Sequence, residues 1–166
     1  MSASLTWRTA TPADARPVVA AIDTWWDRHL EHFVHPLIFE HFGDTCLVVE
    51  DHGRLVAFLV GVLSQRHADQ AYVHFIGVHP AYRGRGLGRE LYVRFFALAR
   101  ESGRTLVVAE TGAFNRDSIA FHRRLGFLLE EGDVEIDGVP VQHGFHGTGE
   151  DVVLFLKRLD QEQASV

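Results

Sequence analysis

The residues with the clearest chemical potential in this sequence are glycines and arginines that alternate over one short stretch. The stretch consists of Arg83, Gly84, Arg85, Gly86, Leu87, Gly88 and Arg89. A segment of β-forming residues precedes it at 71–78, and apolar residues with helical spacing follow it, so we predict a tight strand-to-helix loop. Glycines leave backbone N–H groups accessible, and the start of a helix carries a partial positive charge. The loop is therefore predicted to bind phosphate, with Arg83, Arg85 and Arg89 adding full charges.

Two common phosphate-binding motifs are excluded. The dinucleotide pattern G-x-G-x-x-G would need glycine at position 89, where the chain has Arg89. The nucleotide P-loop would need lysine and then serine or threonine after Gly88, which is followed by arginine and glutamate. The pattern that does fit is Arg-x-x-Gly-x-Gly, formed by Arg83, Gly86 and Gly88 directly after a Val-x-Pro sequence.

A second informative segment covers residues 115–127. Asn115 is a favourable cap residue at its start, and a glycine follows its last helical residues. Asn115, Ser118 and His122 are spaced by three and four, so they share one face of the predicted helix. Phe121 and its apolar neighbour at position 125 occupy the adjacent face, which is expected to pack on a sheet.

Together these segments resemble the GNAT superfamily of acyl-CoA N-acyltransferases, whose members carry the Arg-x-x-Gly-x-Gly loop and, later, Asn-x-x-Ser/Ala-x-x-Phe-Tyr-x-x-x-Gly-Phe. His122 stands where the family usually has tyrosine. The resemblance implies a single α/β domain with a mixed, mostly antiparallel central sheet flanked by helices. It also implies that the sheet splays between its fourth and fifth strands, here 71–78 and 104–111, and that acetyl-CoA enters the opening.

The resemblance further implies a direct transfer of acetyl from acetyl-CoA to a primary amine, which we expect to belong to a small molecule. Backbone N–H groups of the fourth strand would hold the pantetheine arm, and those of the loop would hold the pyrophosphate. The residues expected to bind the coenzyme are Ile76, Val78, Arg83, Arg85, Gly86, Leu87, Gly88, Arg89, Asn115 and Ser118.

Proton transfer points to three further residues. An alkylamine must lose a proton before it attacks, and histidine is suited to accept it. Strand alternation places His74 on one face with Tyr72, Ile76 and Val78. We predict that His74 is the base, the alternative being a hydrogen-bonded histidine of the core. Glu110 is the alternative base, or else it orients a cation. His122 is expected to protonate the leaving thiolate as an imidazolium or to position a water for that step; the alternative is that the acid lies elsewhere or is not needed.

Aromatic residues suggest where the acceptor binds. Trp25, Trp26, His29 and Phe33 lie in the region where GNAT relatives build the acceptor wall, although a helix that packs its tryptophans on the sheet explains them equally well. Three histidines at intervals of three, His29, His32 and His35, have no cysteine nearby and are followed by a proline. We therefore predict no metal site.

Composition sets the broad limits. The 166 residues are 46% apolar, which is enough for one domain over residues 1–160, with 161–166 as a frayed tail. The net charge of −6 disfavours nucleic acid as a partner. The single Cys46 excludes an internal disulfide, and the longest apolar run, Leu55 to Leu63, is far shorter than the ~20 residues that span a bilayer. We expect a cytoplasmic protein that does not insert into membranes.

Two other functions remain compatible with the sequence. One is acetylation of a protein N-terminus or lysine, and the other is a non-catalytic acyl-CoA-binding module that has lost its proton-transfer groups. The segments 134–141 and 144–150 either cover the acceptor site or form the contact of a homodimer.

Overall fold

A seven-stranded sheet organises the chain in the computed structural model, which describes residues 5–26, 34–145, 147 and 149–160. Its strand order is β1-β2-β3-β4-β5-β9-β6, and all neighbours are antiparallel except β4 and β5, which are parallel. The strands are β1 (Leu5–Thr9), β2 (Leu47–Asp51), β3 (Arg54–Leu63), β4 (Gln70–Val78), β5 (Leu106–Gly112), β6 (Leu128–Leu129) and β9 (Val152–Arg158). The short strands β7 (Val134–Ile136) and β8 (Val139–Val141) form a separate hairpin. The predicted mixed sheet is confirmed.

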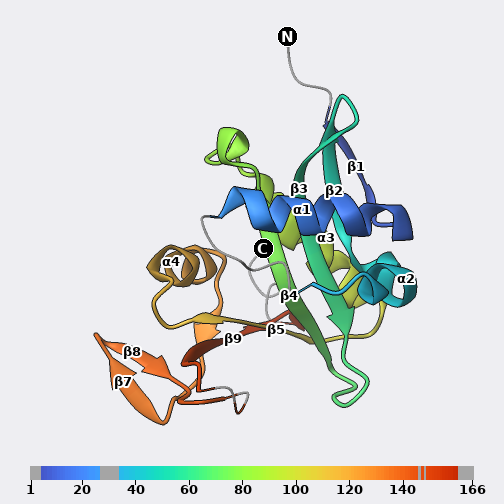
Figure 1. Cartoon of the computed structure of the whole chain (residues 1–166). Helices are drawn as coiled ribbons and strands as arrows, with labels where there is room; N and C mark the ends of the chain where they lie inside the picture. Colours follow the sequence, from blue (N-terminus) through green and yellow to red (C-terminus); the bar gives the residue numbers. More distant parts are fainter. Residues whose placement is uncertain (1–4, 27–33, 146, 148, 161–166) are drawn as a thin grey trace.

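Helices lie on both faces of this sheet (Figure 1). They are α1 (Ala15–Trp25), α2 (Leu37–Phe42), α3 (Leu87–Glu101) and α4 (Arg116–Arg124), with short 3-10 turns η1 (Pro12–Asp14), η3 (Gly43–Thr45) and η4 (Pro80–Tyr82). The core is accordingly divided in two, with Leu91 and Phe95 of α3 fully buried in one cluster and Ile22 and Phe58 in the other. Each such side chain stabilises the fold by about 1.5–3 kcal/mol when removed from water.

The sheet opens between β4 and β5. The two strands pair only from Gln70 with Leu106 to Val73 with Ala109, although both continue well beyond these residues. Along its whole length β5 also pairs with β9. Beyond Ala109 it therefore stays with β9 and no longer pairs with β4. Figure 1 shows the divergence of β4 from β5. The predicted splay is therefore present, and it begins after Val73.

One sequence prediction about β4 is wrong. Val60 of β3 pairs with Phe75 and Gly61 pairs with Val73, so His74 is an extra residue with no counterpart in β3. Such a bulge interrupts the alternation of side chains. Val73 therefore packs with Ile76 in the cluster that includes α3, whereas Phe75 packs with the cluster that includes α1.

The bulge also changes the neighbours of His74. Tyr72 lies between Ala71 and Val73, both buried in the α3 cluster, so it faces the side of α1. The rings of Tyr72 and His74 are 5.8 Å apart. Tyr72 and His74 thus lie together, and they do not share a face with Ile76 and Val78 as strict alternation predicted.

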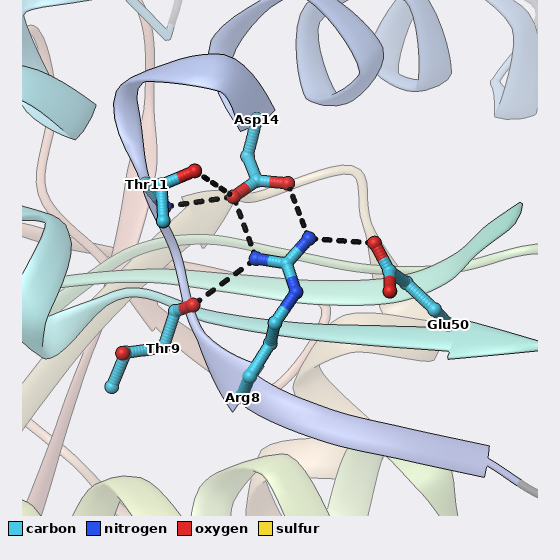
Figure 2. A network of polar contacts seen from close by, with 5 residues as sticks. All are labelled: Arg8, Thr9, Thr11, Asp14 and Glu50. Atoms are coloured by element: carbon cyan, nitrogen blue, oxygen red, sulfur yellow. Dashed lines mark hydrogen bonds and ion pairs between the residues drawn. The ribbon is translucent and has the colours of Figure 1, made fainter. Parts of the chain in front are cut away.

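A partly buried network of charges lies at the start of α1 (Figure 2). The guanidinium of Arg8 donates two hydrogen bonds of 2.8 Å to the carboxylate of Asp14 and one of 2.6 Å to Glu50. The backbone N–H of Thr11 donates to the same Asp14 carboxylate at 2.7 Å. The hydrogen bonds to Arg8 lower the pKa of Asp14. This network joins β1, β2 and the first turn before α1, and thereby sets where α1 crosses the sheet.

Candidate active site

The glycine-rich loop lies where the sequence predicts it, between β4 and α3. Gly84 and Gly86 have φ angles of 74° and 82°, a left-handed conformation that costs other residues roughly 1–2 kcal/mol. Gly86 is the cap of α3, and the first helical hydrogen bond runs from the N–H of Glu90 to its carbonyl. The N–H groups of Leu87, Gly88 and Arg89 precede that bond, so they have no acceptor within the helix. This arrangement suits an anion.

The arginines of the loop differ in their surroundings. All three are exposed, and the guanidinium of Arg85 lies 4.9 Å from the ring centre of Tyr82. Arg83 donates from Nε to the carbonyl of Val78 and from Nη2 to the carbonyl of Trp25, both at 3.1 Å. Arg83 therefore contacts the end of α1, whereas Arg85 and Arg89 stay close to the helix start that could hold a phosphate.

The edge of β4 that faces the opening is the second part of the site. The N–H of His79 bonds to Val56 on the β3 side. Successive amides of a strand point to opposite edges, so those of Val78 and Ile76 point into the opening. Since β5 has parted from β4 there, this edge is available to an extended ligand that ends at the glycine loop.

Three polar side chains meet beside the opening. Tyr72 and His74 come from β4, and Glu110 lies on β5 one residue beyond the last parallel pair. Burial, together with the charge of Glu110 and a hydrogen bond to it, raises the pKa of Tyr72 above its usual range. Tyr72 therefore remains a neutral phenol that donates to the Glu110 carboxylate. A carboxylate held in this way attracts a cation, and the neighbouring imidazole of His74 can accept a proton.

His122 lies deeper than the sequence suggests. Its side chain is nearly inaccessible and stacks on Phe155 with ring centres 4.2 Å apart. Its Nδ1 lies 2.8 Å from the carbonyl of Ser118, and its Nε2 lies 2.6 Å from the hydroxyl of Tyr92. A carbonyl only accepts, so Nδ1 carries the proton and Nε2 accepts from Tyr92.

The electrostatics of His122 follow from this burial. Burial lowers the pKa of His122 to about 4, and the carbonyl of Ser118 opposes the shift only in part. The imidazole is then neutral at physiological pH, and both of its nitrogens are engaged. These surroundings do not suit the predicted imidazolium acid, because the buried ring stays neutral and the hydroxyl of Tyr92 on α3 already occupies Nε2.

The other residues expected at the start of α4 form its cap. The side-chain oxygen of Asn115 accepts from the N–H of Ser118 at 3.2 Å, and the hydroxyl of Ser118 lies 3.3 Å from Nδ1 of His122. Asn115, Ser118 and His122 do share one face, as their spacing indicates. Their hydrogen bonds stabilise the start of α4.

The aromatic residues at the end of α1 lie against β3 and β4. The ring of Trp25 is 5.6 Å from Phe58 and 5.3 Å from His79, and that of Trp26 is 5.4 Å from Phe75. Both tryptophans are only half-buried. They therefore pack on the sheet and still present a surface on the side where Tyr72 and His74 lie. His29 and Phe33 lie outside the described residues, as does His32.

The described part of the chain contains neither a metal-binding cluster nor a membrane-spanning helix. No three metal-binding side chains in it come together, and none of its helices is both long and apolar enough to cross a membrane.

Comparison with known proteins identifies the family of this chain. The profile of the acetyltransferase (GNAT) family matches residues 7–127. The chain belongs to this family. It is 44% identical over 56 residues to the L-methionine sulfoximine/L-methionine sulfone acetyltransferase of Salmonella typhimurium, which is 34% of this chain and 33% of that protein. It is 32% identical over 91 residues to the L-2,4-diaminobutyric acid acetyltransferase of Shouchella clausii, which is 54% of this chain and 50% of that protein.

These alignments span only about a third to a half of the curated relatives, whereas the structural likeness is longer. Diaminobutyrate acetyltransferase EctA from Paenibacillus lautus, in complex with its substrate and coenzyme A, has a TM-score of 0.67. The match covers 93% of this chain and 95% of that one at 18% identity. At this identity the likeness shows the GNAT fold.

Sequence reasoning missed two residues of this candidate site. The sequence places Tyr72 on a face of β4 without a role, and it gives no reason to single out Tyr92. No local signal marks either one, because their partners, Glu110 and His122, come from other elements.

Proposed function

We propose that this GNAT protein transfers the acetyl group of acetyl-CoA to the primary amine of a small amino-acid-like molecule. The observation that carries the proposal is the opening between β4 and β5, which has a helix start suited to phosphate at one end and polar side chains beside it. Relatives that act on methionine sulfoximine and diaminobutyrate support the substrate class.

The coenzyme binds by backbone contacts in this proposal. The N–H groups of Ile76 and Val78 hold the pantetheine arm, and those of Gly86, Leu87, Gly88 and Arg89 hold the pyrophosphate, with Arg85 adding charge. Preorganised donors of this kind can also stabilise the oxyanion that forms when the amine attacks the thioester. Because the thioester is already activated, holding both reactants together suffices, and no covalent enzyme intermediate is needed.

The acceptor amine binds beside the opening, on the face of β4 that is turned towards α1. Glu110, held by Tyr72, attracts its ammonium group, and His74 removes the proton that prevents attack. Trp25 and Trp26 supply the apolar wall. The leaving thiolate takes its proton from solvent or from the ammonium formed by the attack, since His122 is neutral and enclosed.

The test is acceptor-dependent thiol release from acetyl-CoA, measured with L-amino acids, methionine sulfoximine, 2,4-diaminobutyrate, aryl amines, polyamines and short peptides. The variant His74→Gln should lower kcat roughly 10²- to 10⁴-fold at neutral pH. It should recover in part at high pH, where more of the amine is unprotonated. Glu110→Gln should mainly raise the KM for the amine. His67→Gln is the matched control, because His67 is exposed in the β3–β4 connection.

Each result has a distinct meaning. Release with amino acids supports the proposal, whereas release with peptides alone would instead indicate a protein acetyltransferase. Coenzyme binding without release for any amine would indicate a non-catalytic acyl-CoA-binding module. An unchanged kcat in His74→Gln would remove His74 from the proton transfer.

A further inference from the structure

Arg83 connects two parts of the molecule that the reaction uses separately. It is the first residue of the Arg-x-x-Gly-x-Gly loop, yet its Nη2 donates to the carbonyl of Trp25, the last residue of α1, at 3.1 Å. Its Nε donates to Val78, the last residue of β4, at the same distance. One side chain thus joins the coenzyme loop, the end of β4 and the end of the acceptor-side helix.

The contact with α1 is favourable for a definite reason. The last carbonyls of a helix have no partner within it, and a positive charge near them also complements the helix dipole. Trp26 follows in an extended conformation, so α1 ends at Trp25. Arg83 therefore acts as a cap for α1 that is supplied from the loop after β4.

A ring contact reinforces the connection. His79, which begins the segment leading into the loop, lies 5.3 Å from Trp25 and 5.8 Å from Tyr82. On the other side of the helix end, Trp26 covers Gly77 of β4 so closely that a Cβ there would lie 2.6 Å from its ring. The tryptophans thus rest on the strand that leads into the loop.

The loop beyond Arg83 has open space beside its glycines. Gly84 and Gly86 follow it, both with positive φ angles and nothing within 4 Å of the position a Cβ would take. An anion bound at the start of α3 would hold these glycines in one conformation. It would therefore also hold Arg83 on the carbonyl of Trp25.

We propose that Arg83 is a positioning residue that couples occupation of the coenzyme loop to the order of the Trp25–Trp26 wall. Coenzyme bound at the loop then favours the arrangement of α1 that receives the amine. By linkage, an amine bound at that wall tightens the coenzyme by the same factor. The inference rests on the proposed function for the place where the coenzyme binds, and it assigns Arg83 a role other than direct contact with pyrophosphate.

The experiment uses the full chain with Trp7→Phe, which leaves Trp25 and Trp26 as the only tryptophans. Coenzyme A is titrated by calorimetry, and acrylamide quenching of tryptophan fluorescence is measured with and without saturating coenzyme A. Excitation at about 295 nm avoids the adenine. We expect coenzyme A to lower the quenching constant on the order of twofold in this parent, as coupling between the two regions requires.

The decisive variant adds Arg83→Gln. It should bind coenzyme A within about fivefold of the parent, yet its quenching constant should no longer respond. The matched control is Arg85→Gln, which removes the same charge from the same loop but contacts Tyr82 rather than α1. That control should bind coenzyme A more weakly and, at saturation, shield the tryptophans as the parent does.

The outcomes separate the two proposals. The coupling is overturned if coenzyme A lowers the quenching constant equally in the parent and in Arg83→Gln. It is also overturned if coenzyme A binds to the parent without lowering that constant. Either result leaves the proposed function standing. A much larger loss of affinity in Arg83→Gln with shielding retained also overturns the coupling, since Arg83 would then be a pyrophosphate ligand. A parent that does not bind coenzyme A overturns both.

Discussion

The pH dependence of stability offers a direct check on the surroundings of His122. Burial lowers the pKa of this imidazole from 6.5 to about 4 in the folded protein. Between these two values the unfolded chain binds the proton more readily than the folded one. The contribution of His122 is therefore fully present above pH 6.5 and is lost as the pH falls towards 4.

The magnitude follows from the two pKa values. With 6.5 unfolded and about 4 folded, the free energy of unfolding should fall by about 2 kcal/mol between about pH 7.5 and about pH 5 from this group alone. The chain has ten other histidines among its 11, so the effect must be isolated by comparison with a variant that lacks this titration.

The suitable variant changes Tyr92 and His122 to phenylalanine together. His122→Phe alone would leave the hydroxyl of Tyr92 buried without its 2.6 Å partner, which costs about 1–3 kcal/mol for an unrelated reason. The double variant removes the donor and acceptor at once and keeps an aromatic ring against Phe155.

The assay is urea unfolding followed by circular dichroism at both pH values. The wild type should lose about 2 kcal/mol more than the double variant when the pH is lowered. Equal losses in the two proteins would refute the reasoning, because they would show that His122 titrates normally in the fold.

Three further outcomes follow from the described contacts. Gly86→Ala should lower the free energy of unfolding by about 1–2 kcal/mol and weaken the binding of coenzyme A measured by calorimetry, because φ is 82° at this helix start. An unchanged stability together with an unchanged affinity would contradict the loop geometry. Asp14→Asn should cost about 1–3 kcal/mol in neutral urea unfolding, since it breaks the paired bonds to Arg8. That cost should shrink as the pH falls below 3.8, because the unfolded wild-type chain protonates this carboxylate there while the folded chain, in which its pKa is lowered, does so only at lower pH. Burial raises the pKa of Cys46 to about 11, so a disulfide reagent at about pH 8 should modify it only after unfolding; rapid modification of the native protein would show that the thiol is accessible.

Local chemistry determined much of the fold from the sequence alone. The glycine loop, its strand and its helix are fixed by neighbouring residues, because glycine spacing, β-branched runs and helical periodicity act over a few positions. The cap formed by Asn115 and Ser118 is equally local. The order of these two segments led to the GNAT resemblance, and with it to the opening between β4 and β5.

Tertiary structure decided the roles of individual side chains. The bulge at His74 depends on how β3 pairs with β4, and the residues of β4 alone do not indicate it. The burial of His122 depends on Tyr92 and Phe155 from two other elements, and the direction of Arg83 depends on where α1 ends. Hydrogen bonds and desolvation act between groups that are close in space, so a histidine or an arginine acquires its chemistry only when distant segments of the chain surround it.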